Sequence, residues 1–165
     1  CYEVKTLPGI EESYPDTLSG EEIPVFIACE KADAYRQTMH SDELIITADT
    51  IVWLDGLVMG KPEDEEDARR MLRCLSGKTH QVITGVCLTT TEFQKSFATV
   101  TDVTFAELTE EEIDYYVQKY KPMDKAGSYG IQEWIGFVGV EGITGSYFNV
   151  MGLPIQRLYK ELKKL

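Results

Sequence analysis

The chain has 165 residues, of which 43% are hydrophobic, and it carries a formal net charge of −12 at pH 7. A chain of this length can bury about two thirds of its unfolded surface in one core, so a single domain is expected. The negative charge disfavours long-range attraction to nucleic acid polymers and to membranes, and neither is an expected partner. An anionic substrate would therefore need local cations or a metal.

The sequence favours a soluble cytoplasmic protein with reduced thiols. No apolar run reaches the ~20 residues that a bilayer-spanning helix needs, and no signal peptide is visible. Four cysteines are far apart in the sequence and form no C-x-x-C pair, which argues against a zinc site or a disulfide framework. They are Cys1, Cys29, Cys74 and Cys87.

The first elements follow a loop at 8–22 that is rich in proline, glycine and glutamate. The run 44-LIITADTIVWL-54 predicts a strand covered on both faces, and Asp55-Gly56 predicts a tight turn into a short returning strand at 57–59. Between the loop and the first strand, a helix is predicted from Pro24, with an apolar face formed by Ile23, Phe26, Ile27 and Ala34.

The middle of the chain predicts a helix and a strand pair. Acidic residues at 63–66 suit a helix N-terminus, and Gly77 is the expected C-cap. The runs 80–91 and 96–108 are rich in β-forming residues and predict two antiparallel strands. The helical period is carried by Ala68, Met71, Leu72 and Leu75.

The last third predicts two helices around an irregular segment. Thr109 and Glu112 form a capping box that starts one helix, and the glycine-rich block 126–152 is expected to hold one or two short strands. Pro154 opens a terminal helix with Ile155, Leu158, Tyr159 and Leu162 facing inward. The order of elements predicts an α/β fold, with a mixed, twisted sheet flanked by helices.

Asp49 is the sharpest chemical signal, because a carboxylate inside an apolar strand needs a cation, a metal or hydrogen-bond donors. Two interpretations have equal weight on this basis: a structural role, in which Asp49 caps a strand end or pairs with a structural arginine, or a catalytic role. In a regular strand, the hydroxyl of Thr50 points to the opposite face. His80 is interpreted as a packing or hydrogen-bonding residue at the start of a strand.

Other candidate binding residues are weaker when taken alone. Lys61 lies between Gly60 and Pro62, so its backbone is stiff and its ammonium suits a phosphate. In 124-DKAGSYGIQ-132, two glycines permit close approach of a ligand. The amide of Gln132 carries an acceptor beside donors, which matches N3–H and O4 of uracil or thymine. No Ser/His/Asp signature, P-loop or Rossmann fingerprint is present.

Together, several segments resemble the Maf family of nucleoside triphosphate pyrophosphatases in order and spacing over nearly the whole chain. They are 9-GIEES, 30-EKA, 48-ADTIV, 60-GKP, 68-ARRMLRCLSGKTHQVITGV-86, 101-TDVTF-105, 124-DKAGSYGIQ-132 and 145-GSYFNVMGLP-154. The resemblance implies a Maf/ITPase-like fold with the active site in a cleft. It also implies hydrolysis of a nucleoside triphosphate to the monophosphate and pyrophosphate with Mg²⁺ or Mn²⁺, and it allows a homodimer.

The resemblance assigns roles to individual residues. Asp49 would accept the proton of the attacking water, and Glu12 and Asp49 would lie nearest the metal. Thr50 and Gln132 match the branch that prefers dTTP and UTP. The substrate-binding residues implied are Lys31, Thr50, Lys61, Lys125 and Gln132, with Lys31 and Lys61 neutralising phosphate oxygens.

One departure concerns the start of the chain. Family members open with a strand, a Ser-Pro-Arg-Arg phosphate loop and a helix, whereas Cys1-Tyr2-Glu3-Val4 resembles the segment that follows them. We expect that these elements precede the given sequence and that restoring them raises the hydrolysis rate. Two alternatives remain: an inosine and xanthosine triphosphatase, which Gln132 and the ADT motif disfavour, and a catalytically weak nucleotide-binding regulator of septum formation.

Overall fold

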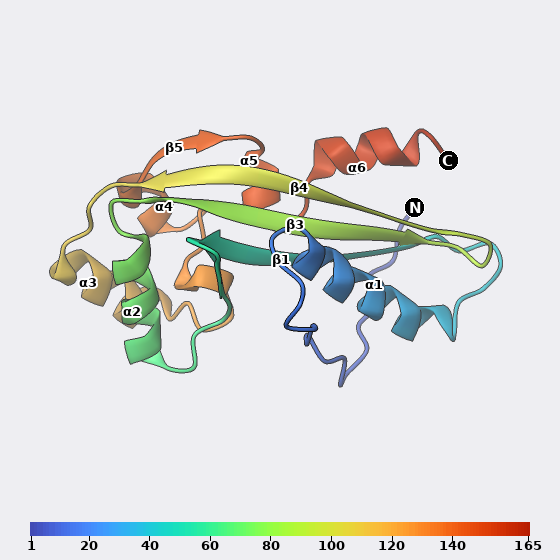
Figure 1. The fold of residues 1–165 in the computed structure, drawn as a ribbon, viewed down its shortest axis with the longest axis horizontal. Coiled ribbons are helices and arrows are strands. Elements are labelled where there is room, and N and C mark those ends of the chain that lie inside the picture. The colour runs from blue at the N-terminus through green and yellow to red at the C-terminus, as the bar shows by residue number, and fades with distance from the viewer.

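A computed structural model describes residues 1–165 as a five-stranded sheet with helices on both faces (Figure 1). The α/β class is therefore confirmed. The elements in chain order are α1 (Glu22–Arg36), β1 (Ile45–Leu54), β2 (Leu57–Met59), α2 (Glu65–Leu75), β3 (Thr79–Thr89), β4 (Gln94–Phe105), α3 (Glu110–Tyr120), the 3-10 turn η1 (Ala126–Ser128), α4 (Trp134–Gly139), β5 (Val140–Thr144), α5 (Tyr147–Val150) and α6 (Ile155–Leu162).

The sheet has the strand order β2-β1-β3-β4-β5, and all four pairings are antiparallel, so the sheet is purely antiparallel rather than mixed. The predicted pairing of β3 with β4 is confirmed. β1 pairs with β3 along nearly its whole length, so that Asp49 lies opposite Gly85 and Thr50 opposite Thr84. The other edge of β1 pairs with β2 only at 52–54.

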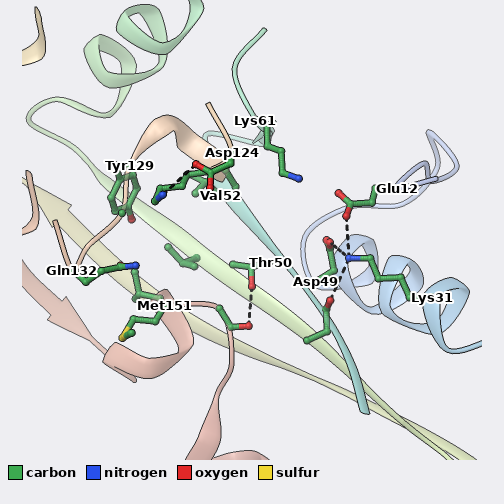
Figure 2. A pocket seen from close by; sticks show the side chains of 17 residues that line it. Glu12, Lys31, Asp49, Thr50, Val52, Lys61, Asp124, Tyr129, Gln132 and Met151 are labelled. Atoms are coloured by element: carbon green, nitrogen blue, oxygen red, sulfur yellow. Dashed lines mark hydrogen bonds and ion pairs between the residues drawn. The ribbon is translucent and has the colours of Figure 1, made fainter. Parts of the chain in front are cut away.

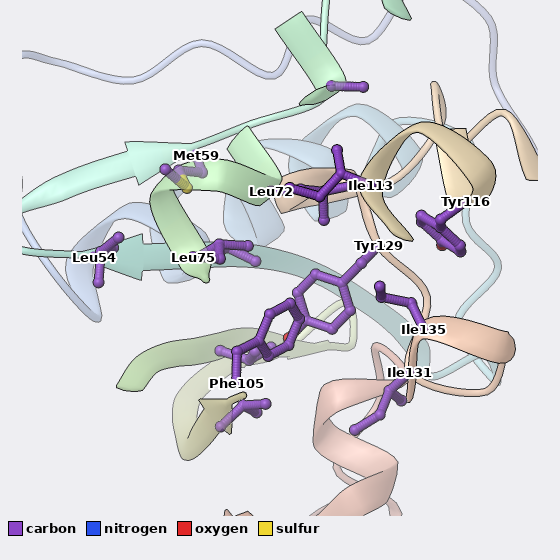
Figure 3. Packing of buried hydrophobic residues seen from close by; sticks show 14 of the residues in the cluster. Leu54, Met59, Leu72, Leu75, Phe105, Ile113, Tyr116, Tyr129, Ile131 and Ile135 are labelled. Carbon is purple, nitrogen blue, oxygen red and sulfur yellow. The ribbon is translucent and has the colours of Figure 1, made fainter. Parts of the chain in front are cut away.

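Alternation along the strands sends successive side chains to two different helical layers. Ile51 and Ile83 pack with Ile23 and Ile27 of α1 on one face. The opposite face carries the main core, which packs against α2 and α3 (Figure 3). Figure 1 shows α1 and α6 on opposite sides of the sheet. The two apolar layers explain why β1 reads as an almost continuous apolar run.

Helix α1 approaches the sheet unusually closely at Gly85 of β3. A Cβ atom added to Gly85 would lie 2.3 Å from the backbone carbonyl carbon of Pro24. Ala28 and Ala32 continue the contact with fully buried small side chains. The hydroxyl of Thr47 donates a hydrogen bond to the Ala28 carbonyl at 2.7 Å. The predicted apolar face is thus correct at its start, but Ala32 rather than Ala34 is buried at its end.

Local capping signals were confirmed. Thr109 accepts a hydrogen bond from the backbone N–H of Glu112, and the Glu112 carboxylate accepts one from the Thr109 N–H. In α2, the four predicted apolar positions are all buried. The C-cap of α2 is Ser76 rather than Gly77, which follows it with a φ of 68°. Gly77 still ends the helix, because this backbone conformation suits glycine.

The predicted inward face of α6 is wrong at two of four positions. Ile155 and Tyr159 are 50% and 61% exposed, whereas Leu158 and Glu161 are buried. Glu161 faces inward because Lys95, Arg157 and Lys164 surround its carboxylate within 3.0 Å. Three cations compensate for the loss of water around one buried charge. The block 126–152 contains one strand, β5, as expected. None of the helices combines the length and apolar character that crossing a membrane requires.

Candidate active site

A cavity of about 310 Å³ is lined by residues of β1, α1, the first loop and the glycine-rich segment. Its lining includes Asp49 and Thr50, so it reaches both faces of the strand. Figure 2 shows a charged end formed by Glu12, Lys31 and Asp49, and a second end near Gln132 and Met151. Thr50 lies between the two ends.

At the charged end, one lysine joins two carboxylates. Lys31 Nζ lies 3.0 Å from Asp49 Oδ1 and 3.1 Å from Glu12 Oε1. It also donates to the Ala48 carbonyl at 3.4 Å. The Asp49 side chain is only 9% exposed, whereas that of Glu12 is 47% exposed. The structural partner that Asp49 required is therefore a lysine from α1, not an arginine.

The electrostatics of this end follow from burial and from ion pairing. Burial raises the pKa of Asp49 above that of an ordinary aspartate, and attraction by the Lys31 ammonium offsets only part of this effect. Burial also opposes the charged form of Lys31, but its two carboxylate partners outweigh burial and hold the pKa of Lys31 above its ordinary value. Lys31 is therefore a permanent cation near neutral pH, and Asp49 is a stronger base than a surface aspartate.

Thr50 points to the opposite face from Asp49, as predicted, and belongs to a hydroxyl network. Its Oγ1 lies 2.9 Å from Thr84 Oγ1 and donates to the Gly152 carbonyl at 3.3 Å. Thr84 Oγ1 also lies within donating distance, 3.3 Å, of the Asn149 carbonyl. Two hydroxyl protons thus serve three contacts. The network ties β1 and β3 to the segment after α5, which lines the cavity at Met151 and Gly152.

The glycine-rich segment 124–132 lies against β1 and forms another wall. A Cβ atom added to Gly127 would lie 2.9 Å from Val52, and the Gly127 N–H donates to the Gly60 carbonyl at 3.1 Å. This contact places the segment beside Lys61. Lys125 is engaged by Asp124 at 3.2 Å and by Glu133 at 3.6 Å. Gln132 is exposed and lines the cavity.

Comparison with known proteins matches residues 2–165 to the family described as Maf-like protein. The chain belongs to the Maf-like family. It is 80% identical over 164 residues to a dTTP/UTP pyrophosphatase of Phocaeicola vulgatus. The alignment covers 99% of this chain and 85% of that relative. Proteins with the same name match at 71% in Bacteroides fragilis, with equal coverage, and at 53% in Porphyromonas gingivalis, over 98% of this chain and 82% of the relative.

The cavity of this Maf-like chain brings together every residue that the sequence singled out for binding or catalysis. The structure places them on four separate parts of the chain: the first loop, α1, the β1–β2 region and the glycine-rich segment. Their individual roles remain predictions. The seven residues that line the same cavity are Glu12, Lys31, Asp49, Thr50, Lys61, Lys125 and Gln132.

Sequence reasoning did not single out Tyr129 and Met151, which also line the cavity. Tyr129 is buried, and its hydroxyl lies 2.6 Å from His80 Nε2. His80 is therefore a hydrogen-bonding core residue, as interpreted. Both cavity residues lie inside the motifs that carry the Maf-like resemblance. A tyrosine or methionine in a glycine-rich segment gives no local signal of a ligand, so only the fold reveals them.

The donor set of the Maf-like cavity fits a divalent cation that completes its coordination with substrate. No group of three or more His, Cys, Asp or Glu side chains is placed to hold a metal alone. Two carboxylates, Glu12 and Asp49, do converge on one point, which Lys31 Nζ marks. Mg²⁺ commonly binds through one or two carboxylates together with substrate phosphates and waters. The pair therefore suits a cation that binds with a triphosphate.

Proposed function

We propose that this protein hydrolyses dTTP and UTP to the nucleoside monophosphate and pyrophosphate, with a divalent cation as cofactor. Relatives that are 53–80% identical over nearly the whole chain are named dTTP/UTP pyrophosphatase. The observation that carries the proposal is the polarity of one cavity, with two lysines near its carboxylate end and an amide at the other. A nucleoside triphosphate is built in the same way, with an anionic triphosphate at one end and a hydrogen-bonding base at the other.

In this proposal, the triphosphate lies at the end formed by Lys31 and Lys61. Lys61 has no carboxylate within 4.0 Å of its ammonium, unlike Lys31 and Lys125. It is therefore free to pair with a phosphate oxygen. Two such cations matter here, because the protein as a whole carries a charge of −12 and repels a polyanion at long range.

Asp49 accepts the proton of the water that attacks the α-phosphorus, and the bond from the α-phosphorus to the oxygen bridging it to the β-phosphorus breaks. Burial supports this role, because it raises the pKa of the carboxylate and so makes it a better proton acceptor. A divalent cation held by Glu12 and Asp49 would neutralise phosphate charge and acidify bound water. Phosphoryl transfer depends mainly on positioning and charge neutralisation of this kind.

Gln132 and Thr50 support the choice of a pyrimidine. The exposed amide of Gln132 offers a donor and an acceptor to O4 and N3–H of uracil or thymine. Thr50 fixes the opposing wall through the Gly152 carbonyl. Gln132 lies at the far end from the Glu12, Lys31 and Asp49 cluster in Figure 2, as a base attached to a triphosphate requires, and Thr50 lies between the two ends.

Pyrophosphate release from dTTP, UTP, CTP and ITP in the presence of Mg²⁺ or Mn²⁺ tests the proposal. The protein should release pyrophosphate from dTTP and UTP in preference to CTP and ITP, and chelation of the metal should stop the reaction. Release of orthophosphate instead would place the cleavage at another bond. Nucleotide binding without any release would contradict the enzymatic assignment.

A further inference from the structure

Lys31 occupies an oxygen-lined position that would also suit a metal ion. Its ammonium contacts two carboxylates, from Glu12 and Asp49, at 3.1 and 3.0 Å, and the backbone carbonyl of Ala48 at 3.4 Å. Carboxylates and backbone carbonyls are the ligands that hard divalent cations prefer. The Lys31 ammonium thus contacts the same oxygens that a divalent cation would bind, and both are positively charged.

Simultaneous occupation by the ammonium and a divalent cation is electrostatically unfavourable. The side chain of Lys31 is only 21% exposed, so water screens its charge weakly. A lysine, however, is a compact charge on a flexible four-carbon stem, so it can leave one set of oxygens for another. A triphosphate provides such oxygens, because it carries several negative charges of its own.

We propose that Lys31 is an exchangeable internal cation, which holds Glu12 and Asp49 together in the nucleotide-free protein and yields its place to a divalent cation when a triphosphate binds. The inference rests on the proposed function. Lys31 then pairs with phosphate oxygens, and the two carboxylates turn to the metal. The free protein therefore has low affinity for the metal, and metal and triphosphate bind cooperatively. The exchange also keeps Asp49 from remaining a buried, uncompensated charge between turnovers.

Mn²⁺ binding to the nucleotide-free protein tests the exchange directly, with unbound Mn²⁺ measured by electron paramagnetic resonance. Wild type should bind Mn²⁺ weakly, and Lys31→Met should bind it roughly tenfold or more tightly, because the competing charge is removed. Lys61→Met is the matched control, since Lys61 lines the same cavity but has no carboxylate partner. Its effect should be clearly smaller. Equal effects of the two variants, or tight binding by wild type, would overturn the proposal.

A second measurement needs no variant and so does not depend on the folding of Lys31→Met. The probe is a non-hydrolysable dTTP analogue with a methylene bridge between the α and β phosphorus atoms. Wild type should bind Mn²⁺ more tightly with this analogue than without it, and the gain should exceed the Mn²⁺ that the analogue binds in free solution. No increase would overturn the exchange. The pyrophosphate assay separates the two conclusions, because turnover of dTTP with tight metal binding in the free protein would refute only the role of Lys31.

A separate observation concerns two cysteines that lie far apart in the sequence. Cys29 of α1 and Cys87 of β3 have their Sγ atoms 3.5 Å apart, and both are free thiols. Cys87 is fully buried and Cys29 partly exposed. The close approach of α1 to the sheet at Gly85 brings the two backbones together. A disulfide needs its two sulfur atoms brought together, and the fold already holds these two 3.5 Å apart.

The geometry points to Cys29 and Cys87 as a reversible dithiol–disulfide pair. The partly exposed Cys29 thiolate attacks one sulfur of a low-molecular-weight disulfide and releases one thiolate. The Cys87 sulfur then attacks Cys29 Sγ, and the second small-molecule thiolate leaves and takes up the Cys87 proton. The two protein thiols are oxidised and the small disulfide is reduced to two thiols. Hydrogen bonding between the two thiols lowers the pKa of Cys29 and raises the pKa of Cys87, which supports Cys29 as the group that attacks first.

Incubation with oxidised glutathione followed by mass spectrometry tests the pair. The native protein should lose two hydrogens and yield a peptide in which Cys29 is linked to Cys87, and a reductant should reverse the change. Cys29→Ser should abolish the link, and Cys74→Ser, at a partly exposed cysteine on α2, should not. Stable glutathione adducts on Cys29, or links through Cys1 or Cys74 alone, would overturn the assignment.

Discussion

Gly85 of β3 lies directly against the backbone of Pro24 at the start of α1, so no side chain fits between the strand and the helix. An added Cβ atom would lie 2.3 Å from both the carbonyl carbon of Pro24 and the nitrogen of Val25. Since these are backbone atoms, the contact can be relieved only if α1 moves. The same helix carries Lys31 to Asp49, so the packing at Gly85 sets the geometry of the charged end of the cavity.

Gly85→Ala should therefore destabilise the fold and impair the site together. Overpacking of this kind costs about 1–3 kcal/mol, and here the cost should lie at the upper end. Unfolding in urea measures the stability, and hydrolysis of dTTP measures the site. Gly142→Ala is the control, because a Cβ atom at Gly142 of β5 meets nothing within 4 Å. A folded Gly85→Ala protein with unchanged stability would show that α1 does not depend on this contact.

Asp49→Asn should reduce turnover of dTTP by roughly 10²- to 10⁴-fold, because the amide cannot accept the proton of the attacking water. Binding of a non-hydrolysable dTTP analogue should remain nearly intact. Asp102→Asn provides the control, since Asp102 is a half-buried aspartate of β4 that does not line the cavity. Unchanged turnover in Asp49→Asn would remove Asp49 from the mechanism.

Gln132→Glu should change the choice of base rather than the rate of the chemical step. A carboxylate cannot donate to O4 of uracil, but it can accept from the exocyclic amino group of cytosine. We expect the ratio of kcat/KM for UTP over CTP to fall by about tenfold, the equivalent of one hydrogen bond. Gln156→Glu, on the exposed surface of α6, should leave the ratio unchanged. If Gln132→Glu leaves it unchanged too, another group reads the base.

Thr50→Val tests the wall that joins β1 to the segment after α5. Valine keeps the shape of threonine but leaves the Gly152 carbonyl without the Thr50 donor. The expected loss of stability is about 1 kcal/mol. Thr50→Ser, which retains the hydroxyl, should restore most of it. Selectivity between dTTP and ITP should fall in Thr50→Val and not in Thr50→Ser; equal selectivity in both would show that the hydroxyl does not position the wall.

His80 should make stability depend on pH. Burial lowers the pKa of His80 to about 4 from 6.5, so between these values the unfolded chain binds a proton that the folded protein does not. Stability should therefore fall as the pH falls through this window, by about 3 kcal/mol in total. His80→Gln should weaken this dependence, whereas His40→Gln, at an exposed histidine, should not. Parallel curves for His80→Gln and wild type would contradict a buried neutral histidine.

The sequence predicted secondary structure correctly where the residues that determine it lie close together along the chain. The capping box at Thr109 and Glu112 and the apolar period of α2 depend on residues three or four positions apart. The face of α6 could not be predicted in the same way. Its hydrophobic period points Tyr159 inward, but Glu161 is buried because Lys95, from a distant strand, pairs with it. Arg157 and Lys164 are local partners of Glu161, but the pairing with Lys95 cannot be read from the sequence of the helix.

The candidate site shows the same division. A carboxylate inside the apolar run of β1 showed that Asp49 needed a positive partner, but its identity could not follow from the strand alone. Lys31 reaches it from α1, the helix whose backbone packs against β3 at Gly85. The proximity of Cys29 to Cys87 has the same origin, since spacing along the chain says nothing about two sulfur atoms that a helix and a strand bring together.

Asp49 and Thr50 are neighbours in the sequence, yet one faces the lysine of α1 and the other the carbonyl of Gly152. Pairing with β3 fixes which residue faces which way, and a shift of one residue would reverse every side chain of β1. In the roles proposed for them, a substitution of Thr50 should alter the base preference and a substitution of Asp49 the hydrolytic step, each without the other. A single-residue insertion or deletion in this strand exchanges the two positions at once, so we expect the site to tolerate a substitution at either position better than a change in the length of the strand.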